Sequence, residues 1–123
     1  MDIASAKAAS EQLVQHWKQG TTLEALPPSL RPANRAHAYA VQAQLEAISR
    51  QPLFGWKIAA TSTNGQAHIN VGGPLAGRLL SGQVFESGAS VPSAGNRMRV
   101  AEPEFAFVMG QDLPPQSAPY TQR

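Results

Sequence analysis

Two stretches in the first 52 residues carry apolar side chains at the three- and four-residue spacing of an amphipathic helix. The first spans residues 3–19, between Asp2, a residue type that caps helices, and Gly20. The second spans residues 35–50 and begins after Asn34. Pro27-Pro28 and Arg31-Pro32 argue against a regular element in the connector between the two helices. We therefore expect residues 1–52 to form a region of two helices. Their apolar positions are Ala6, Ala9, Leu13 and Trp17 in the first, and Ala38, Val41, Leu45 and Ile48 in the second.

The pattern changes to a two-residue period after Pro52, which indicates β-structure. Residues 53–60 predict a strand in which Phe54, Trp56 and Ile58 face one way and Lys57 faces the other. A short helix over 61–70 and short strands at 83–85 and 89–91 follow in this prediction. Lys57 is then a single charge in an otherwise apolar strand.

A second alternating stretch, residues 99–110, predicts the strand around which the β-region is organised. Glu102 and Glu104 fall on one face of this strand, about 7 Å apart at the backbone, while Phe105, Phe107 and Met109 fall on the other. No periodicity follows, so residues 111–123 are expected to be a loop or disordered tail. The predicted fold is therefore α+β: a helical region at 1–52, then a β-rich mixed-sheet region at 53–110 that includes the Glu-x-Glu strand.

Two carboxylates this close repel each other, and they resist burial unless a shifted pKa, a cation or a metal neutralises them. A divalent ion such as Mg²⁺ is the simplest neutraliser, because it takes oxygen ligands. The alternative is an edge strand whose glutamates face water, which Pro103 favours. For Lys57 the alternatives are a surface lysine or, beside a metal, a group that stabilises an enolate or moves a proton.

The composition excludes several other classes of function. The chain has 123 residues, a net charge of +2 with scattered basic residues, and no cysteine. The charge pattern argues against a nucleic-acid partner, and the lack of cysteine excludes disulfides and thiolate metal sites. No stretch approaches the length of a membrane span, so no membrane partner is expected either. We expect a cytoplasmic protein.

Four sequence segments together resemble the 2-keto-4-pentenoate hydratase family of the fumarylacetoacetate hydrolase superfamily. The segments are Gly55-Trp56-Lys57-Ile58 with Thr61-Ser62, Gly73-Pro74-Leu75 with Gly77, residues 101–110 (AEPEFAFVMG) with Asp112-Leu113, and Ala38-Tyr39 with Gln42 in the second helix. The resemblance covers nearly the whole chain in order.

The resemblance implies a fold like the N-terminal half of that superfamily and a metal-dependent lyase. Glu102 and Glu104 match the pair of glutamates that bind Mg²⁺ or Mn²⁺, and Lys57 matches an active-site lysine. The implied reaction is hydration of a small 2-oxo (enol) acid, 2-hydroxypenta-2,4-dienoate, to 4-hydroxy-2-oxopentanoate in aromatic-compound catabolism. Relatives with the same ligands decarboxylate 4-oxalocrotonate, so a decarboxylase stays an alternative. The resemblance also implies a homo-oligomer.

Two departures from the family pattern bear on the expected activity. The family's third acidic metal ligand follows the Glu pair further along the chain, beyond Arg123, which predicts a truncated or short form. Ser81 stands near a position where many hydratases carry an acid, and a serine is no base at neutral pH. The alternative function is therefore a catalytically inactive short paralogue or fragment that acts only as an assembly partner.

Overall fold

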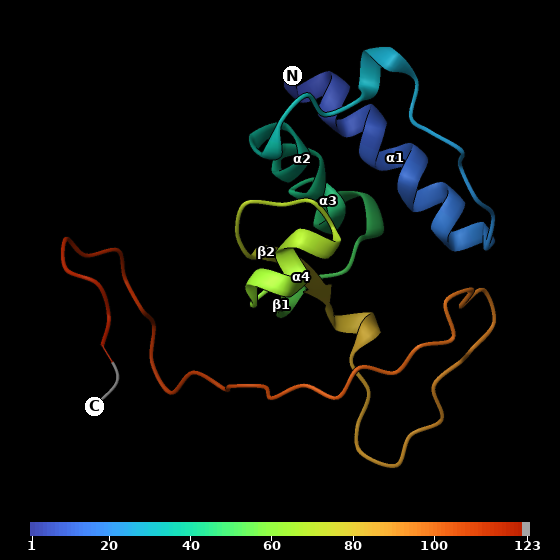
Figure 1. Cartoon of the computed structure of the whole chain (residues 1–123). Coiled ribbons are helices and arrows are strands. Elements are labelled where there is room, and N and C mark those ends of the chain that lie inside the picture. Colours follow the sequence, from blue (N-terminus) through green and yellow to red (C-terminus); the bar gives the residue numbers. More distant parts are fainter. Residues whose placement is uncertain (122–123) are drawn as a thin grey trace.

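Helix α1 (Ile3–Gln19) follows from its two ends and its small inner residues. In the computed structural model, which describes residues 1–121, the Ser5 amide donates to the Asp2 carboxylate at 2.7 Å and caps the N-terminus. The helix ends at Gly20, whose φ of 64° lies in the left-handed region that favours glycine. Ala6 and Ala9 are buried, and their small side chains let the segment that carries Val41 approach the helix closely. The predicted first helix is confirmed (Figure 1).

The second predicted helix forms as two pieces, α2 (Arg35–Gln42) and α3 (Leu45–Ser49), so a single helix over 35–50 was wrong. At the break, the backbone amide of Gln44 donates to the carbonyl of Val41, three residues back. This bond tightens the turn and ends the α-helical pattern, in which each amide bonds to the carbonyl four residues back. Asn34 caps α2 as predicted. A short 3₁₀-helix, η1 (Pro28–Leu30), also forms in the connector, where none was expected. Val41 packs with Ala6 and Ala9 in the core between these helices.

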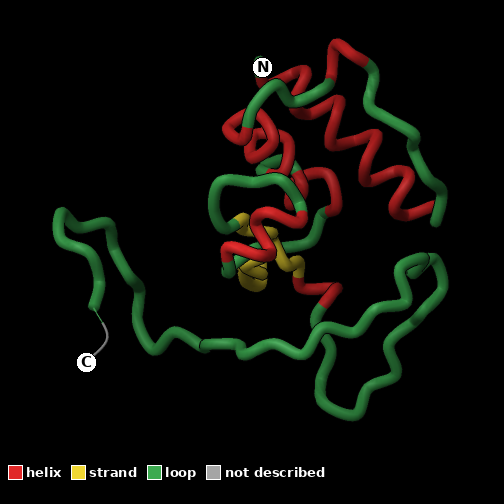
Figure 2. Tube along the Cα trace, viewed as in Figure 1, coloured by secondary structure: helices red, strands yellow, loops and turns green. Residues whose placement is uncertain are grey.

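Two antiparallel strands, β1 (Leu53–Ala59) and β2 (Leu75–Leu80), form the sheet. Trp56 pairs with Arg78 and Lys57 with Gly77. The alternation predicted for β1 is confirmed, since Phe54, Trp56 and Ile58 are exposed while the residues between them are half-buried. Helix α4 (Thr63–His68), capped by Ser62, connects the strands. The fold is thus α+β, and Figure 2 shows the helices and strands by colour.

Side chains of α2 join the helices to the main chain of β2. The Tyr39 hydroxyl accepts a hydrogen bond from the Ala76 amide at 3.1 Å, and the Gln42 side chain donates to the Ala76 carbonyl at 3.1 Å. Both polar groups of one strand residue are therefore satisfied from a helix. This contact fixes the sheet on the helical region.

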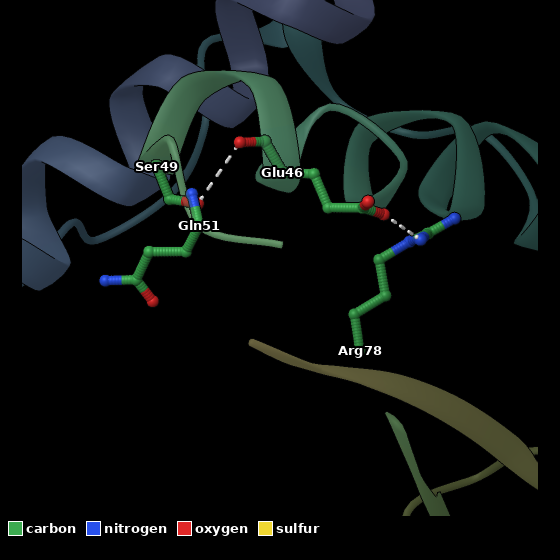
Figure 3. A network of polar contacts seen from close by, with 4 residues as sticks. All are labelled: Glu46, Ser49, Gln51 and Arg78. Carbon is green, nitrogen blue, oxygen red and sulfur yellow. Dashed lines mark hydrogen bonds and ion pairs between the residues drawn. The ribbon is translucent and has the colours of Figure 1, made fainter. Parts of the chain in front are cut away.

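A second link between helix and sheet runs through Arg78. Its guanidinium forms an ion pair with Glu46 of α3 (Figure 3) and also lies 4.8 Å from the centre of the Trp56 ring. Figure 3 also shows how Ser49 ends α3: its hydroxyl donates to the Glu46 carbonyl at 3.5 Å and accepts from the Gln51 amide at 3.3 Å. The ion pair links β2 to α3, and the two hydrogen bonds of Ser49 hold the chain where it leaves α3 toward β1.

The rest of the predicted β-region does not form strands. After η2 (Ser81–Gln83), residues 84–121 contain no helix or strand and are exposed. Figure 1 shows this segment, in orange to red, looping near the end of α1, where the Arg97 side chain donates to the Gly20 carbonyl at 3.3 Å, and then running past the sheet. The strands predicted at 83–85, 89–91 and 99–110 were therefore wrong, because alternation alone makes no strand without a partner for its backbone groups. Residues 122–123 of the predicted tail lie outside the described residues.

None of the helices within residues 1–121 combines the length and the apolar character that a membrane crossing requires.

The contact between α2 and Ala76 predicts a measurable cost of removing one hydroxyl. We expect Tyr39→Phe to lower the free energy of unfolding by about 1 kcal/mol, because the partly buried Ala76 amide loses its acceptor. Urea denaturation followed by circular dichroism measures this change. Tyr120→Phe is the matched control, since the Tyr120 hydroxyl donates to Pro114 in the exposed segment. Equal stability of both variants and the parent chain would contradict this account of the contact.

Candidate functional site

Lys57 occupies the middle of β1 on the half-buried face of the strand. Its neighbour across the sheet is Gly77, which has no side chain to occupy the space beside it. The Lys57 side chain remains 38% exposed, so its ammonium group reaches solvent and the segment beyond the sheet. The position of this lysine thus follows from the alternation of β1 and from the glycine opposite.

Glu102 and Glu104 both contact the ammonium group of Lys57. The Nζ atom lies 3.2 Å from Oε2 of Glu102 and forms a second, closer ion pair with Oε1 of Glu104. The three residues singled out in the sequence therefore come together, although 47 positions separate Lys57 from Glu104. Segment 100–110 carries no strand, yet the spacing of two still lets both carboxylates reach one point.

The two glutamates hold Lys57 in its charged form. Hydrogen bonds to Glu104 and then to Glu102 raise the pKa of Lys57 above its ordinary value, and their negative charges add to this effect. Partial desolvation opposes the shift without reversing it. One ammonium faces two carboxylates, so the cluster keeps a formal charge of −1. All three side chains are substantially exposed, so solvent screening makes these ion pairs weak contributors to stability.

The oxygen atoms of Glu102 and Glu104 converge on a single cationic atom, the Nζ of Lys57. Hard divalent cations favour such a set of carboxylate oxygens, with water completing the shell. Among residues 1–121, however, no cluster of three or more His, Asp or Glu side chains is present. The donor set thus fits Mg²⁺ or Mn²⁺ with two protein ligands, which implies weak binding.

Arg78 is the residue that sequence reasoning missed near this site. Arg78 lies on β2 opposite Trp56 and directly after Gly77, the residue opposite Lys57. Its guanidinium forms an ion pair with Glu46. Residues 75–80 show no clear two-residue pattern, so β2 was not predicted as a strand. The single charge in that short apolar run was the available signal. Ser81, by contrast, lies at the start of η2 and is exposed.

No family model matches the chain, and no curated protein or solved structure matches it.

The charged state of Lys57 predicts a specific pH dependence. Because its folded-state pKa is raised, the ion pairs contribute stability below the ordinary value of 10.5, and this contribution is lost as the pH rises through the raised pKa. We expect NMR titration of the Lys57 side chain to give a midpoint above 10.5.

The matched variants make this prediction specific to the two glutamates. Glu102→Gln/Glu104→Gln should return the midpoint toward the ordinary value, since it removes both partners. Glu24→Gln/Glu86→Gln removes the same charge from exposed positions and should leave the Lys57 midpoint unchanged. Equal titration of Lys57 in both double variants would show that the ion pairs do not form in solution.

Proposed function

We propose that this chain belongs to a metal-dependent hydratase acting on 2-hydroxypenta-2,4-dienoate-type 2-oxo acids, with Glu102 and Glu104 as ligands of Mg²⁺ or Mn²⁺. The observation that supports the proposal is the convergence of both carboxylates on Lys57 from distant parts of the sequence. The resemblance of these same segments to the hydratase family supplies the class of substrate and reaction. We place this activity in the cytoplasm, as expected for a cysteine-free chain.

The residues would divide the chemistry between them. Glu102 and Glu104 would hold the divalent ion, which would supply Lewis-acid polarisation of the 2-oxo acid group. Lys57 is protonated at neutral pH even at the ordinary pKa of 10.5, without the rise that its contacts with the two glutamates add, which favours electrostatic stabilisation of negative charge on the substrate over a role as general base. With both carboxylates holding a metal, the exposed ammonium group of Lys57 would be free to donate to a substrate oxygen.

One observation favours the alternative, a non-enzymatic assembly partner. Phe105 and Phe107 are 98% and 88% exposed, directly after the Glu pair. Large aromatic side chains this exposed are common at surfaces that contact another protein. The absence of a third acidic ligand among residues 1–121 also fits this alternative.

Metal binding is the measurement that separates these two functions. We expect the chain to bind Mn²⁺ weakly but saturably, and Glu102→Gln/Glu104→Gln to abolish this binding because it removes both anionic ligands. Electron paramagnetic resonance of free Mn²⁺ measures the bound fraction directly. Glu24→Gln/Glu86→Gln has the same net charge and should bind as the parent chain does. Equal binding by all three proteins, or none, would refute the metal site.

The contact of Lys57 with both glutamates predicts that the lysine competes with the metal. Lys57→Met should tighten Mn²⁺ binding by about threefold to tenfold, since the ammonium repels a second cation and occupies the same oxygens. Lys7→Met is the control for net charge, because Lys7 lies on α1 and contacts Glu11 instead. A decrease in affinity on Lys57→Met would mean that the lysine supports the metal ligands, and the competition would be disproved.

A further inference from the structure

The two outer edges of the sheet differ in how their backbone groups are satisfied. The outer edge of β2 is covered at Ala76, whose amide and carbonyl bond to Tyr39 and Gln42. The outer edge of β1 has no such cover within residues 1–121, since no hydrogen bond from outside the β1–β2 pair reaches its main chain. An uncovered edge is a template for pairing with another strand.

The exposed face beside this edge is apolar. Phe54, Trp56 and Ile58 follow one another on it and are 65%, 50% and 47% exposed. Arg78 lies over one part of the Trp56 ring but leaves the rest of the indole accessible. The free edge therefore combines unpaired backbone groups with three large apolar side chains.

The sequence of β1 is complementary to itself in an antiparallel arrangement. When two copies pair with Trp56 opposite Trp56 of the second copy, each Phe54 lies opposite an Ile58. On the other face each Lys57 lies opposite a Gly55, so no two lysines meet directly. Aromatic–aromatic and aromatic–β-branched pairs are favourable across antiparallel strands, and like charges are not.

We propose that two copies of this chain associate through the β1 edge, centred on Trp56, to form one four-stranded antiparallel sheet. The same patch on both subunits makes the interface, as a twofold axis requires. The inference goes beyond the proposed hydratase and does not depend on it. Each Lys57 keeps its contacts with Glu102 and Glu104 of its own chain.

The rival occupant of this edge is segment 100–109 of the same chain. Its glutamates already contact the Lys57 side chain, yet its backbone makes no hydrogen bond to β1. Pro103 lies between the two glutamates and has no amide hydrogen to donate, which weakens this segment as a third strand. β1 of a second copy has no proline, so it suits the edge better.

The size of the apolar patch sets the strength of the association. From their exposed fractions, the three side chains offer on the order of 300 Å² per copy. A stable interface buries about 800 Å² per partner, so this dimer forms weakly and depends on concentration. The backbone hydrogen bonds between the two β1 strands determine the register of the dimer and add little to its affinity.

Cysteine cross-linking tests the register, and the chain has no native cysteine to interfere. Under mild oxidation we expect Trp56→Cys to form covalent dimers, because opposite residues bring their Cβ atoms within about 4.5–5.5 Å, near disulfide range. Phe54→Cys alone should not, but a mixture of Phe54→Cys with Ile58→Cys should. Ile69→Cys, at a similarly exposed apolar position outside the sheet, is the control. Cross-linking of Trp56→Cys no faster than this control would overturn the proposal.

Sedimentation equilibrium of the unmodified chain tests the association itself. The expected mass rises with concentration from 13.1 kDa toward twice that value. Ile58→Lys should lose this rise by placing a charge on the patch, and Ile69→Lys should keep it. A mass that stays at the monomer value, or that Ile58→Lys leaves unchanged, would overturn the proposal and leave the edge to the chain's own segment or to another partner. Glu102→Gln/Glu104→Gln should keep the dimer although it loses the metal site, so the test of the dimer is independent of the test of metal binding.

Discussion

The hydrogen bonds that the Ala76 main chain makes with Tyr39 and Gln42 are the contact on which the position of the site depends. A two-stranded sheet is marginal on its own and needs to pack on other elements. Here one helix satisfies both backbone groups of a single strand residue and so fixes β2. Because β1 is hydrogen-bonded to β2, the position of Lys57 follows from the same contact.

This contact also determines which surface of the sheet is left open. α2 covers the outer edge of β2 at Ala76. Among the described residues, 1–121, the outer edge of β1 is therefore the sheet edge that remains available to a further strand. The two faces of β1 then have different surroundings. Lys57 points to the side reached by Glu102 and Glu104, whereas Trp56 points to the apolar side with Arg78. One strand therefore carries the charged cluster on one face and the apolar patch on the other.

Local signals in the sequence were sufficient for some elements and insufficient for others. α1, the cap of α2 and strand β1 were predictable because a cap residue or a simple alternation determines each of them. The break at residues 43–44 was not, since the hydrogen bond between Gln44 and Val41 leaves no mark in the apolar pattern. The strand expected at 99–110 failed for a different reason. Its alternation is clear, but strand formation depends on a distant partner that the pattern does not specify.

The candidate site was predictable in its members but not in its charge balance. Glu102 and Glu104 were recognisable as two like charges that need a neutraliser, for which a shifted pKa, a cation and a metal were the options. In the structure Lys57 is the cation that meets them, a pairing that a separation of 47 positions conceals in the sequence. Since these exposed ion pairs are weak, they present only a small barrier to a divalent ion. It follows that the number of carboxylates around the ion, more than the presence of Lys57, determines how strongly a metal can bind here.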